Sequence, residues 1–417
     1  MITASALAPE RLLAPLASIV GQEHATLREG TIVVVPGDVE QVAEVLRFAQ
    51  ANRLAVMPTG GGTKLDWGNP VAAAIQLSMR RMAQVREHAW QDMTCTVEAG
   101  CTWAEMQKTL AEHEQTVALD PLWPERATVG GILATNDSGA LRIRFGGLRD
   151  LVIGMTFVLA DGTVAKSGGK VVKNVAGYDL HKLLTGSFGT LGVIAEVNFR
   201  LHPAERFGQT WSVAARDAAA DPDCFSKPLS ALMESQMTPS GVQLRVSNSE
   251  CALYIRIAAL PECVAEYDAR IRSIFDGFTV APSDGAAWHA RQEIFDSDVE
   301  FVLKASVIAA EVCPVASELR KWAHDEGAEI ALVCQANGLM TVGLHSQRGA
   351  AVRFAELIRA RLRKSGGSAT ALRIPDAIRD AADVWGPQPD ALPLMREIKR
   401  RFDPGRVLNP GRFVGNI

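Results

Sequence analysis

A glycine-rich stretch that directly follows a strand constrains the fold most: Pro58-Thr59-Gly60-Gly61-Gly62-Thr63-Lys64. Upstream of it, Thr31–Val35 is an apolar β-branched run, which is typical of a buried strand. A helix start at Asp38 follows, with one apolar stripe made of Val42, Val45, Leu46 and Ala49. Leu54–Met57 predicts a second strand. Residues 31–64 are therefore expected to form a strand–helix–strand unit that ends in the glycine-rich loop.

This loop has the composition of an anion-binding site. Three successive glycines permit positive φ angles and let a ligand approach bare backbone N–H groups. Thr59 and Thr63 add hydroxyl donors, and Lys64 adds a cation. A plain tight turn between two strands explains the same residues about equally well. The two commonest phosphate-binding patterns, G-x-G-x-x-G and G-x-x-x-x-G-K-[ST], are both absent from the sequence.

A second cluster of small and hydroxylated residues spans Thr128–Gly139. A diphosphate that joins two nucleoside halves needs hydrogen-bond donors from more than one side, and two separate clusters could supply them. On composition alone, the pair of clusters suggests that a nucleotide diphosphate is held between them.

The remaining elements indicate a mixed α and β chain. Leu151–Ala160 and Thr163–Lys166 flank Asp161-Gly162, a strong signal for a two-residue hairpin. After Pro203 the glycine density falls, and strands alternate with helices to about residue 374, which favours an α+β layer. A last helix is expected over Pro393–Phe402.

Composition excludes several classes of protein. The chain has 417 residues, of which 47% are hydrophobic, so two or three domains with cores of their own are expected and disorder is not. A net charge of −4 gives no electrostatic reason for a nucleic-acid partner. The sequence lacks an uninterrupted apolar run long enough to span a membrane, and its first residues do not read as a signal peptide.

The cysteines argue against metal or disulfide chemistry. All seven are widely spaced and none forms a C-x-x-C pair, so a disulfide framework, a zinc site and an iron–sulfur cluster are not expected. Buried thiols in a reducing cytoplasm are the simplest interpretation. Redox chemistry in this chain would therefore need a bound organic cofactor.

Four segments together carry a resemblance to a known family. PTGGGTK, DPLWPERATVGGILATNDSG, GGKVVKNVAGYDLHKLLTGSFGTLGVIAEV and RRFDPGRVLNPGRF resemble, in order and spacing, the flavin domain of the vanillyl-alcohol oxidase family. Within that family they are most similar to the FAD-binding (E) subunits of bacterial glycolate oxidases (glycolate dehydrogenases). The resemblance covers roughly residues 25–205 and the C-terminal tail.

The resemblance implies a fold and a domain plan. The expected fold is α+β, with a PCMH-type FAD-binding domain made of two α+β subdomains and an inserted α+β cap domain. Residues 1–204 would form the FAD-binding domain, residues 205–374 the cap, and residues 375–417 a segment that returns to the FAD domain.

It also implies which residues bind FAD. Pro58 to Lys64 would wrap the diphosphate with backbone amides, Ile194 would meet the adenine through its backbone, and Asn409 would return from the tail to the flavin domain. Lys173, Asn174 and Tyr178 would lie near the isoalloxazine ring. The complete set of implied cofactor-binding residues is Pro58, Thr59, Gly60, Gly61, Gly62, Thr63, Lys64, Asp120, Pro121, Thr128, Gly130, Gly131, Asn136, Ser138, Gly139, Ile194 and Asn409.

Two departures from the family pattern shape the expected function. The glycine-rich loop contains no His or Cys, so FAD should be bound non-covalently. The cap stretch Ala336–His345 lacks the H-x-G-D-G-N-x-H motif of the catalytic members, so no metal site and no catalytic residue are assigned. His181, beside Asp179, is the first candidate for a base.

The implied function is that of an FAD-binding subunit of a glycolate oxidase complex. That complex would oxidise glycolate, a 2-hydroxy acid, to glyoxylate and pass electrons to a second, catalytic FAD subunit and an iron–sulfur subunit. Two alternatives stay open: a non-catalytic flavin-binding subunit that stabilises the catalytic one, and a stand-alone FAD oxidoreductase for another 2-hydroxy acid. The expected location is the cytoplasm, with contact to the inner face of the membrane through the partners.

Several other residue groups have both a plain and a sharper interpretation. Arg396, Lys399, Arg400 and Arg401 fit a solvated helix end, with docking of an acidic partner as the alternative. Arg142, Arg144 and Arg149 fit ordinary surface tethers or a substrate carboxylate site.

Overall fold

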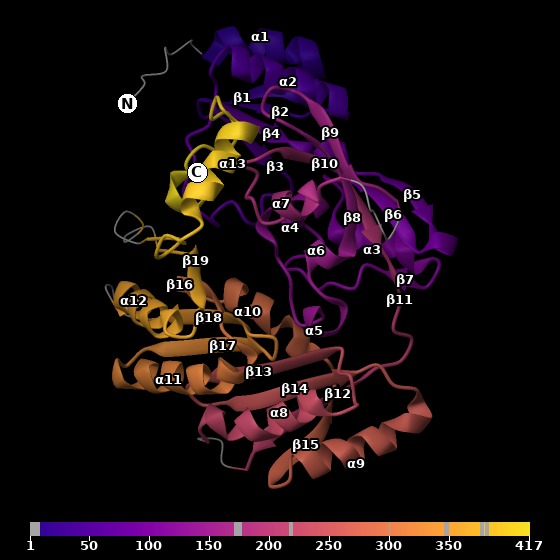
Figure 1. Cartoon of the computed structure of the whole chain (residues 1–417), viewed down its shortest axis with the longest axis vertical. Coiled ribbons are helices and arrows are strands. Elements are labelled where there is room, and N and C mark those ends of the chain that lie inside the picture. The colour runs from indigo at the N-terminus through magenta and orange to yellow at the C-terminus, as the bar shows by residue number, and fades with distance from the viewer. Residues whose placement is uncertain are drawn as a thin grey trace. The chain divides into compact units, whose positions relative to one another are not determined.

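A computed structural model of the chain describes residues 9–170, 177–216, 220–299, 301–345, 350–375, 379 and 383–417. The chain packs as two compact units (Figure 1). The first consists of Met1–Asp137, Gly147–Ala204 and Pro387–Ile417, and the second of Ser138–Gly146 and Glu205–Gly386. Both units combine helices and strands, as the α+β prediction requires. These are units of packing, so the functional division into FAD domain, cap and returning segment stays a prediction.

The first sheet of the first unit is built around the expected strand–helix–strand segment. Its strand order is β1-β2-β4-β3, with β2, β4 and β3 parallel and β1 antiparallel. The Asp38 side chain accepts a hydrogen bond from the backbone N–H of Gln41, which caps helix α2 as the sequence predicts. The elements are α1 Pro9–Val20, β1 Ala25–Arg28, β2 Thr31–Val34, α2 Val39–Ala51, β3 Val56–Thr59 and β4 Ile75–Ser78.

Helix α2 buries one stripe and thereby fixes where the glycine-rich loop emerges. Val42, Val45, Leu46 and Ala49 are fully buried, together with Val56 and Leu77 of the sheet. Because β3 and β4 are parallel, the loop after Thr59 leaves the carboxyl end of the sheet, a usual place for ligands in such sheets.

The second sheet of the first unit is antiparallel, with strand order β5-β6-β10-β8-β9. β8 and β9 form the hairpin predicted around Asp161-Gly162, and Gly162 has a φ of 79°. Helix α4 has no counterpart among the elements expected from the sequence. The elements are β5 Val85–Ala89, β6 Thr94–Glu98, α3 Trp103–Ala111, β7 Gln115–Thr116, α4 Val129–Thr135, α6 Leu148–Leu151, β8 Val152–Val158, β9 Val164–Gly168, α7 Leu180–Leu184, β10 Val193–Arg200 and β11 His202–Pro203.

The C-terminal segment returns to the first unit. Helix α13 spans Leu392–Phe402, and Leu408 forms a parallel bridge with Val56 at the end of β3. Val407 and Leu408 are buried in the same core cluster as helix α2. The tail is thus an integral part of this unit's core.

The second unit is one antiparallel sheet of eight strands in the order β15-β12-β14-β13-β17-β18-β16-β19. Helices α11 and α12 bury their apolar stripes on one face, and α10 lies on the opposite face, where a Cβ at Gly343 would come within 2.8 Å of Ile294. The elements are α5 Arg142–Phe145, β12 Gln209–Ala215, α8 Ser226–Glu234, β13 Gly241–Ser247, β14 Cys251–Ile257, α9 Val264–Ile274, β15 Phe278–Ser283, α10 Ala290–Asp296, β16 Phe301–Ser306, α11 Val312–Asp325, β17 Glu329–Gln335, β18 Leu339–His345, α12 Ala350–Arg363 and β19 Ser368–Arg373.

Candidate cofactor-binding site

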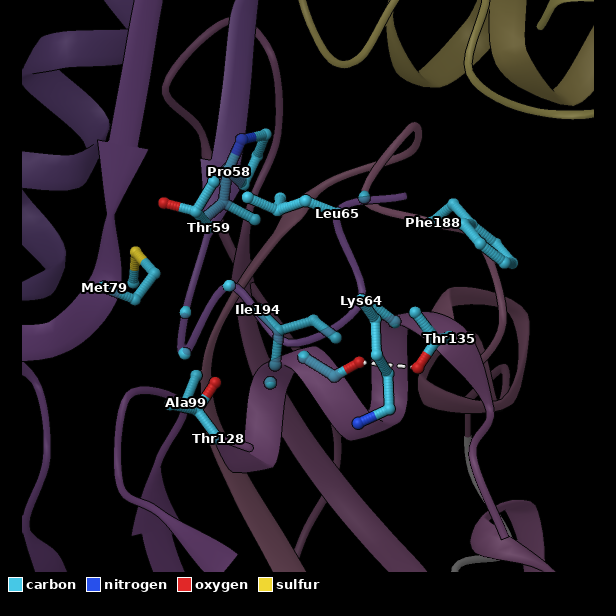
Figure 2. Close-up of a pocket in the computed structure, with 18 of the residues that line it drawn as sticks. Pro58, Thr59, Lys64, Leu65, Met79, Ala99, Thr128, Thr135, Phe188 and Ile194 are labelled. Carbon is cyan, nitrogen blue, oxygen red and sulfur yellow. Dashed lines mark hydrogen bonds between the residues drawn. The ribbon is translucent and has the colours of Figure 1, made fainter. Parts of the chain in front are cut away.

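A pocket in the first unit is lined mainly by four segments that are far apart in the sequence. They are the glycine-rich loop, the start of α4, the chain leading into β10, and the C-terminal tail (Figure 2). The pocket has an empty volume of about 760 Å³, part of which is open to solvent. Its lining consists of Pro58 to Leu65, Met79, Ala99, Thr128, Gly130, Gly131, Ala134, Thr135, Phe188, Gly189, Gly192, Val193, Ile194, Asn409 and Arg412.

Two of the loop glycines are required by the opposite chain segment and not by a positive φ. A Cβ at Gly60 would lie 1.9 Å from Oγ1 of Thr128, and one at Gly61 would lie 1.8 Å from the carbonyl oxygen of Arg126. Of the three loop glycines, only Gly62 has a positive φ, at 75°. The glycine-rich loop therefore packs against residues 126–128, where the second cluster begins. Gly60, Gly61 and Thr128 also line the pocket.

The pocket wall contains buried polar atoms that suit a polar ligand. Thr128, the N-cap residue of α4, is 2% exposed, and Asn409 is 3% exposed. Within the part of the chain that the structure describes, Oγ1 of Thr128 and Oδ1 of Asn409 have no hydrogen-bond partner. A buried polar atom without a partner is costly, and a bound ligand relieves that cost. These residues fit the hydroxyl, amine and phosphate groups of FAD.

Lys64 forms an ion pair with a carboxylate of the same unit. Its Nζ lies 3.4 Å from Oδ2 of Asp137, and both side chains are almost fully buried. The same ammonium lies over the Trp123 ring, 5.3 Å from its centroid. The sequence suggested that Lys64 adds a cation to the anion site; in the structure this cation is already paired.

Arg412 is a pocket residue that sequence reasoning missed. It is 6% exposed, and its Nη2 donates to the carbonyl oxygens of Lys64, at 3.3 Å, and Leu65, at 2.8 Å. Burial lowers its pKa, and the nearby Asp66 carboxylate opposes that shift. Arg412 belongs to the NPGRF motif of the tail, but the sequence alone does not show that the folded tail places it beside the glycine-rich loop.

The structure brings many, but not all, of the expected FAD-binding residues to this pocket. Pro58 to Lys64, Thr128, Gly130, Gly131, Ile194 and Asn409 line it. Asp120, Pro121 and Asn136 belong to the first unit but are not among the lining residues. Ser138 and Gly139 pack with the second unit. Lys173 and Asn174 lie outside the described residues, and Tyr178 is 86% exposed.

His181, the candidate base, is buried in helix α7 and is held by a serine. Its Nδ1 lies 3.2 Å from Oγ of Ser167, and its backbone N–H donates to the same oxygen. Burial lowers the pKa of His181, the Asp179 carboxylate raises it, and Lys182 lowers it further. His181 is not among the residues that line the pocket.

This pKa shift predicts an acid sensitivity of the first unit. Because the folded-state pKa lies below the unfolded value of about 6.5, the unfolded chain takes up the proton first, and stability falls as pH drops below that value. We expect the melting temperature to fall between about pH 7 and 5, and His181→Gln to flatten that fall. The exposed His113→Gln is the control; an unchanged slope in His181→Gln contradicts the assignment.

In the basic cluster at the end of α13, Lys399 is buried, so the interpretation as a solvated helix end is wrong for this residue. Arg400 and Arg401 hydrogen-bond to Glu397 and lower its pKa to about 2. In the arginine group at 142–149, Arg144 donates to the Thr238 carbonyl and Arg149 to the Thr185 carbonyl. These contacts supply plain structural roles for four of the arginines.

The described residues also bear on metals and membranes. In the ranges that the structure covers, three or more His, Cys, Asp or Glu side chains do not converge into a group that could hold a metal ion. A helix of the length and apolarity needed to cross a bilayer is likewise not found in those ranges.

Comparison with known proteins shows a similarity to FAD-binding proteins over part of the chain. Residues 31–168 match the family model of the FAD binding domain. The chain is 36% identical over 180 residues to the mitochondrial D-lactate dehydrogenase [cytochrome] of Arabidopsis thaliana, which covers 43% of this chain and 31% of that protein. It is 33% identical over 172 residues to the glycolate oxidase subunit GlcD of Bacillus subtilis (strain 168), covering 41% of this chain and 37% of that protein.

The alignments thus span less than two fifths of the length of these two relatives. Over the whole chain, p-cresol methylhydroxylase has a similar structure, with a TM-score of 0.73 at 15% identity, covering 97% of this chain and 96% of that one. The protein has the α+β fold of the PCMH-type flavoproteins, as predicted, and its residues 31–168 are similar to the FAD binding domain.

Proposed function

We propose that this chain is the FAD-binding (E) subunit of a glycolate oxidase complex, which oxidises glycolate to glyoxylate. The observation that carries the proposal is the pocket of the first unit: its lining includes Thr128 and Asn409, each with a buried polar atom that has no hydrogen-bond partner among the described residues. The matched relatives include proteins named for D-lactate and glycolate oxidation, which supports a 2-hydroxy acid as the substrate class.

In this proposal the chain binds and orients FAD. The backbone of residues 60–64 and the Thr128 hydroxyl hold the diphosphate, while Met79, Ala99 and Ile194 supply apolar wall. Asp120, Pro121, Asn136, Ser138 and Gly139 are proposed, from the family resemblance alone, to contact the flavin, its ribityl chain and the diphosphate.

The cofactor is proposed to be non-covalent. Covalent flavin attachment needs a nucleophile such as His, Cys or Tyr at the ring. Among the described residues, the pocket lining contains none of these three types. Release of free FAD from the denatured protein is the expected result.

Bound FAD would accept the hydride, which carries both electrons, from the α-carbon of glycolate, while the hydroxyl proton passes to a base. The second FAD subunit and the iron–sulfur subunit are proposed as the route by which electrons leave. The subunit name of the Bacillus relative supports membership in such a complex.

The seven cysteines are all free thiols, which supports a cytoplasmic location, with membrane contact through the partners.

Anaerobic addition of glycolate tests this proposal. We expect the yellow flavin absorbance of the purified, FAD-loaded chain to stay unbleached with glycolate alone and to bleach once the catalytic FAD subunit and the iron–sulfur subunit are added. The reason is that the described residues contain no group of three or more His, Cys, Asp or Glu side chains that could hold a metal ion, and that the candidate base His181 lies outside the pocket lining.

Two other outcomes would support one of the alternative functions. Bleaching of the isolated chain by glycolate or another 2-hydroxy acid supports the stand-alone oxidoreductase. A flavin that stays oxidised within a complex that turns over supports a non-catalytic subunit, which stabilises its partner.

A further inference from the structure

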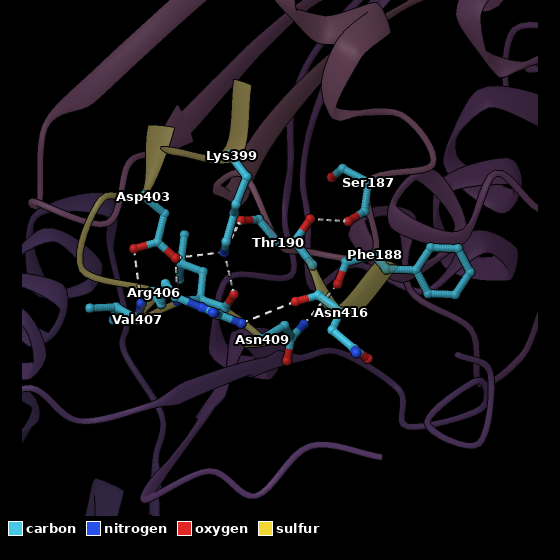
Figure 3. A network of polar contacts seen from close by, with 10 residues as sticks. Ser187, Phe188, Thr190, Lys399, Asp403, Arg406, Val407, Asn409 and Asn416 are labelled. Atoms are coloured by element: carbon cyan, nitrogen blue, oxygen red, sulfur yellow. Dashed lines mark hydrogen bonds and ion pairs between the residues drawn. The ribbon is translucent and has the colours of Figure 1, made fainter. Parts of the chain in front are cut away.

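Helix α13 carries a buried ion pair that closes the C-terminal tail onto the first unit (Figure 3). Nζ of Lys399 lies 2.6 Å from Oδ2 of Asp403, and these residues are 5% and 0% exposed. Nζ also donates to the carbonyl oxygens of Thr190, at 2.7 Å, and Leu408, at 2.8 Å. The three N–H bonds of the ammonium therefore reach the helix, the loop before β10 and the tail.

Asp403 closes the turn that follows the helix. Its Oδ1 accepts from the backbone N–H of Val407 at 2.9 Å, and its Oδ2 accepts from that of Leu408 at 2.8 Å. Burying two charges is expensive, and a buried pair is tolerated when hydrogen bonds satisfy its remaining atoms, as here. Such a pair fixes one geometry of the turn at 403–408.

Asn409 stands directly after this turn and is fixed by two hydrogen bonds. Its backbone N–H donates to the Val56 carbonyl at 2.9 Å. Its Nδ2 donates to the Phe188 carbonyl at 2.7 Å (Figure 3). Its φ of 40° lies in the left-handed region, which Asn tolerates better than most residues. Because Nδ2 is engaged, the amide of this pocket-lining residue is held in one orientation, and its buried Oδ1 has no hydrogen-bond partner among the described residues.

We propose that Lys399 and Asp403 are positioning residues that hold Asn409 so that its Oδ1 accepts a hydrogen bond from an N–H or O–H group of bound FAD. This inference rests on the proposed FAD binding. It makes the C-terminal tail a determinant of cofactor affinity and assigns a function to a charge pair that would otherwise serve only stability.

Titration of the apo chain with FAD, followed by flavin fluorescence, tests the proposal. Asn409→Gly keeps the positive φ and the backbone bonds but removes the acceptor, and we expect the Kd to rise about tenfold. Lys399→Met should raise the Kd by a similar factor. The double variant Lys399→Met/Asn409→Gly should bind no more weakly than Asn409→Gly, because Lys399 acts through Asn409.

A control separates positioning from general loss of stability. Arg359, in the second unit, is also a buried cation that donates to carbonyl oxygens, those of Ala369, Asp383 and Val384. Arg359→Met should lower the melting temperature of the apo chain without changing the Kd for FAD. If Lys399→Met is insoluble, Asp403→Asn takes its place in the same cycle.

The outcomes are distinct. A wild-type chain that does not bind FAD contradicts the proposed function itself. An unchanged Kd in Asn409→Gly, or effects of Lys399→Met and Asn409→Gly that multiply, overturns the positioning role while FAD binding stands. Titrations of the wild type and Asn409→Gly with FMN and with ADP locate the donor on the cofactor. A loss of affinity seen only with ADP assigns the donor to the adenosine half of FAD, and a loss seen only with FMN assigns it to the flavin half.

Discussion

Replacing Gly61 with valine should abolish FAD retention and destabilise the first unit. A Cβ at this position would lie 1.8 Å from the carbonyl oxygen of Arg126, a backbone atom that cannot rotate away. The loop and the segment before α4 must then separate, which distorts both walls of the pocket. We expect a cost of at least about 2–3 kcal/mol in unfolding free energy, with no flavin absorbance in the purified protein. Thermal unfolding and absorbance spectra measure the two effects.

Gly169 provides the matched control for Gly61. It belongs to the same unit, its φ is not positive, and a Cβ there would meet no atom within 4 Å. Gly169→Ala should therefore keep both stability and flavin. A Gly61→Val protein that is purified yellow, at full FAD occupancy, would contradict the contact between the two segments.

Local sequence patterns predicted those parts of the fold that depend on neighbours in the chain. Asp38 caps α2, and the hairpin turns at Asp161-Gly162, because each signal acts over a few residues. Helix α4 was missed because its first turn, Val129-Gly130-Gly131, lacks an apolar stripe and contains two poor helix formers. Contact of its N-terminal residues with the Ala99 and Cys101 carbonyls, far away in sequence, stabilises it instead.

The site was predictable in composition but not in geometry. The glycines of the loop are visible in sequence, yet the reason for Gly60 and Gly61 is the packing of a segment more than sixty positions away. The same holds for Arg412, which lines the pocket and donates to the carbonyls of Lys64 and Leu65, 348 and 347 positions away. Long-range contacts of this kind leave no local pattern from which they could be deduced.

Replacing Lys64 with methionine should destabilise the first unit by about 3–5 kcal/mol, since it leaves the Asp137 carboxylate buried without its cation. Asp137 also accepts a hydrogen bond from the backbone N–H of Leu122, at 2.8 Å. If the Asp137 side chain moves after its cation is removed, the Asp120–Leu122 segment should therefore be disturbed as well. Urea unfolding of the apo chain measures this cost. The exposed pair Lys182–Asp179 of the same unit is the control, and Lys182→Met should leave the urea midpoint nearly unchanged.

The double variant Lys64→Met/Asp137→Asn distinguishes the two roles open to Lys64. It removes both charges but keeps an amide oxygen for the Leu122 N–H, so much of the lost stability should return. If Lys64 serves Asp137, as the 3.4 Å pair indicates, the double variant should bind FAD within a few-fold of the wild-type Kd. If Lys64 instead neutralises the diphosphate, stability recovers while FAD affinity stays low, because a buried charge–phosphate contact is lost in both variants. The comparison of unfolding and FAD titration for these two proteins therefore decides whether the ammonium belongs to the cofactor or to the wall behind it.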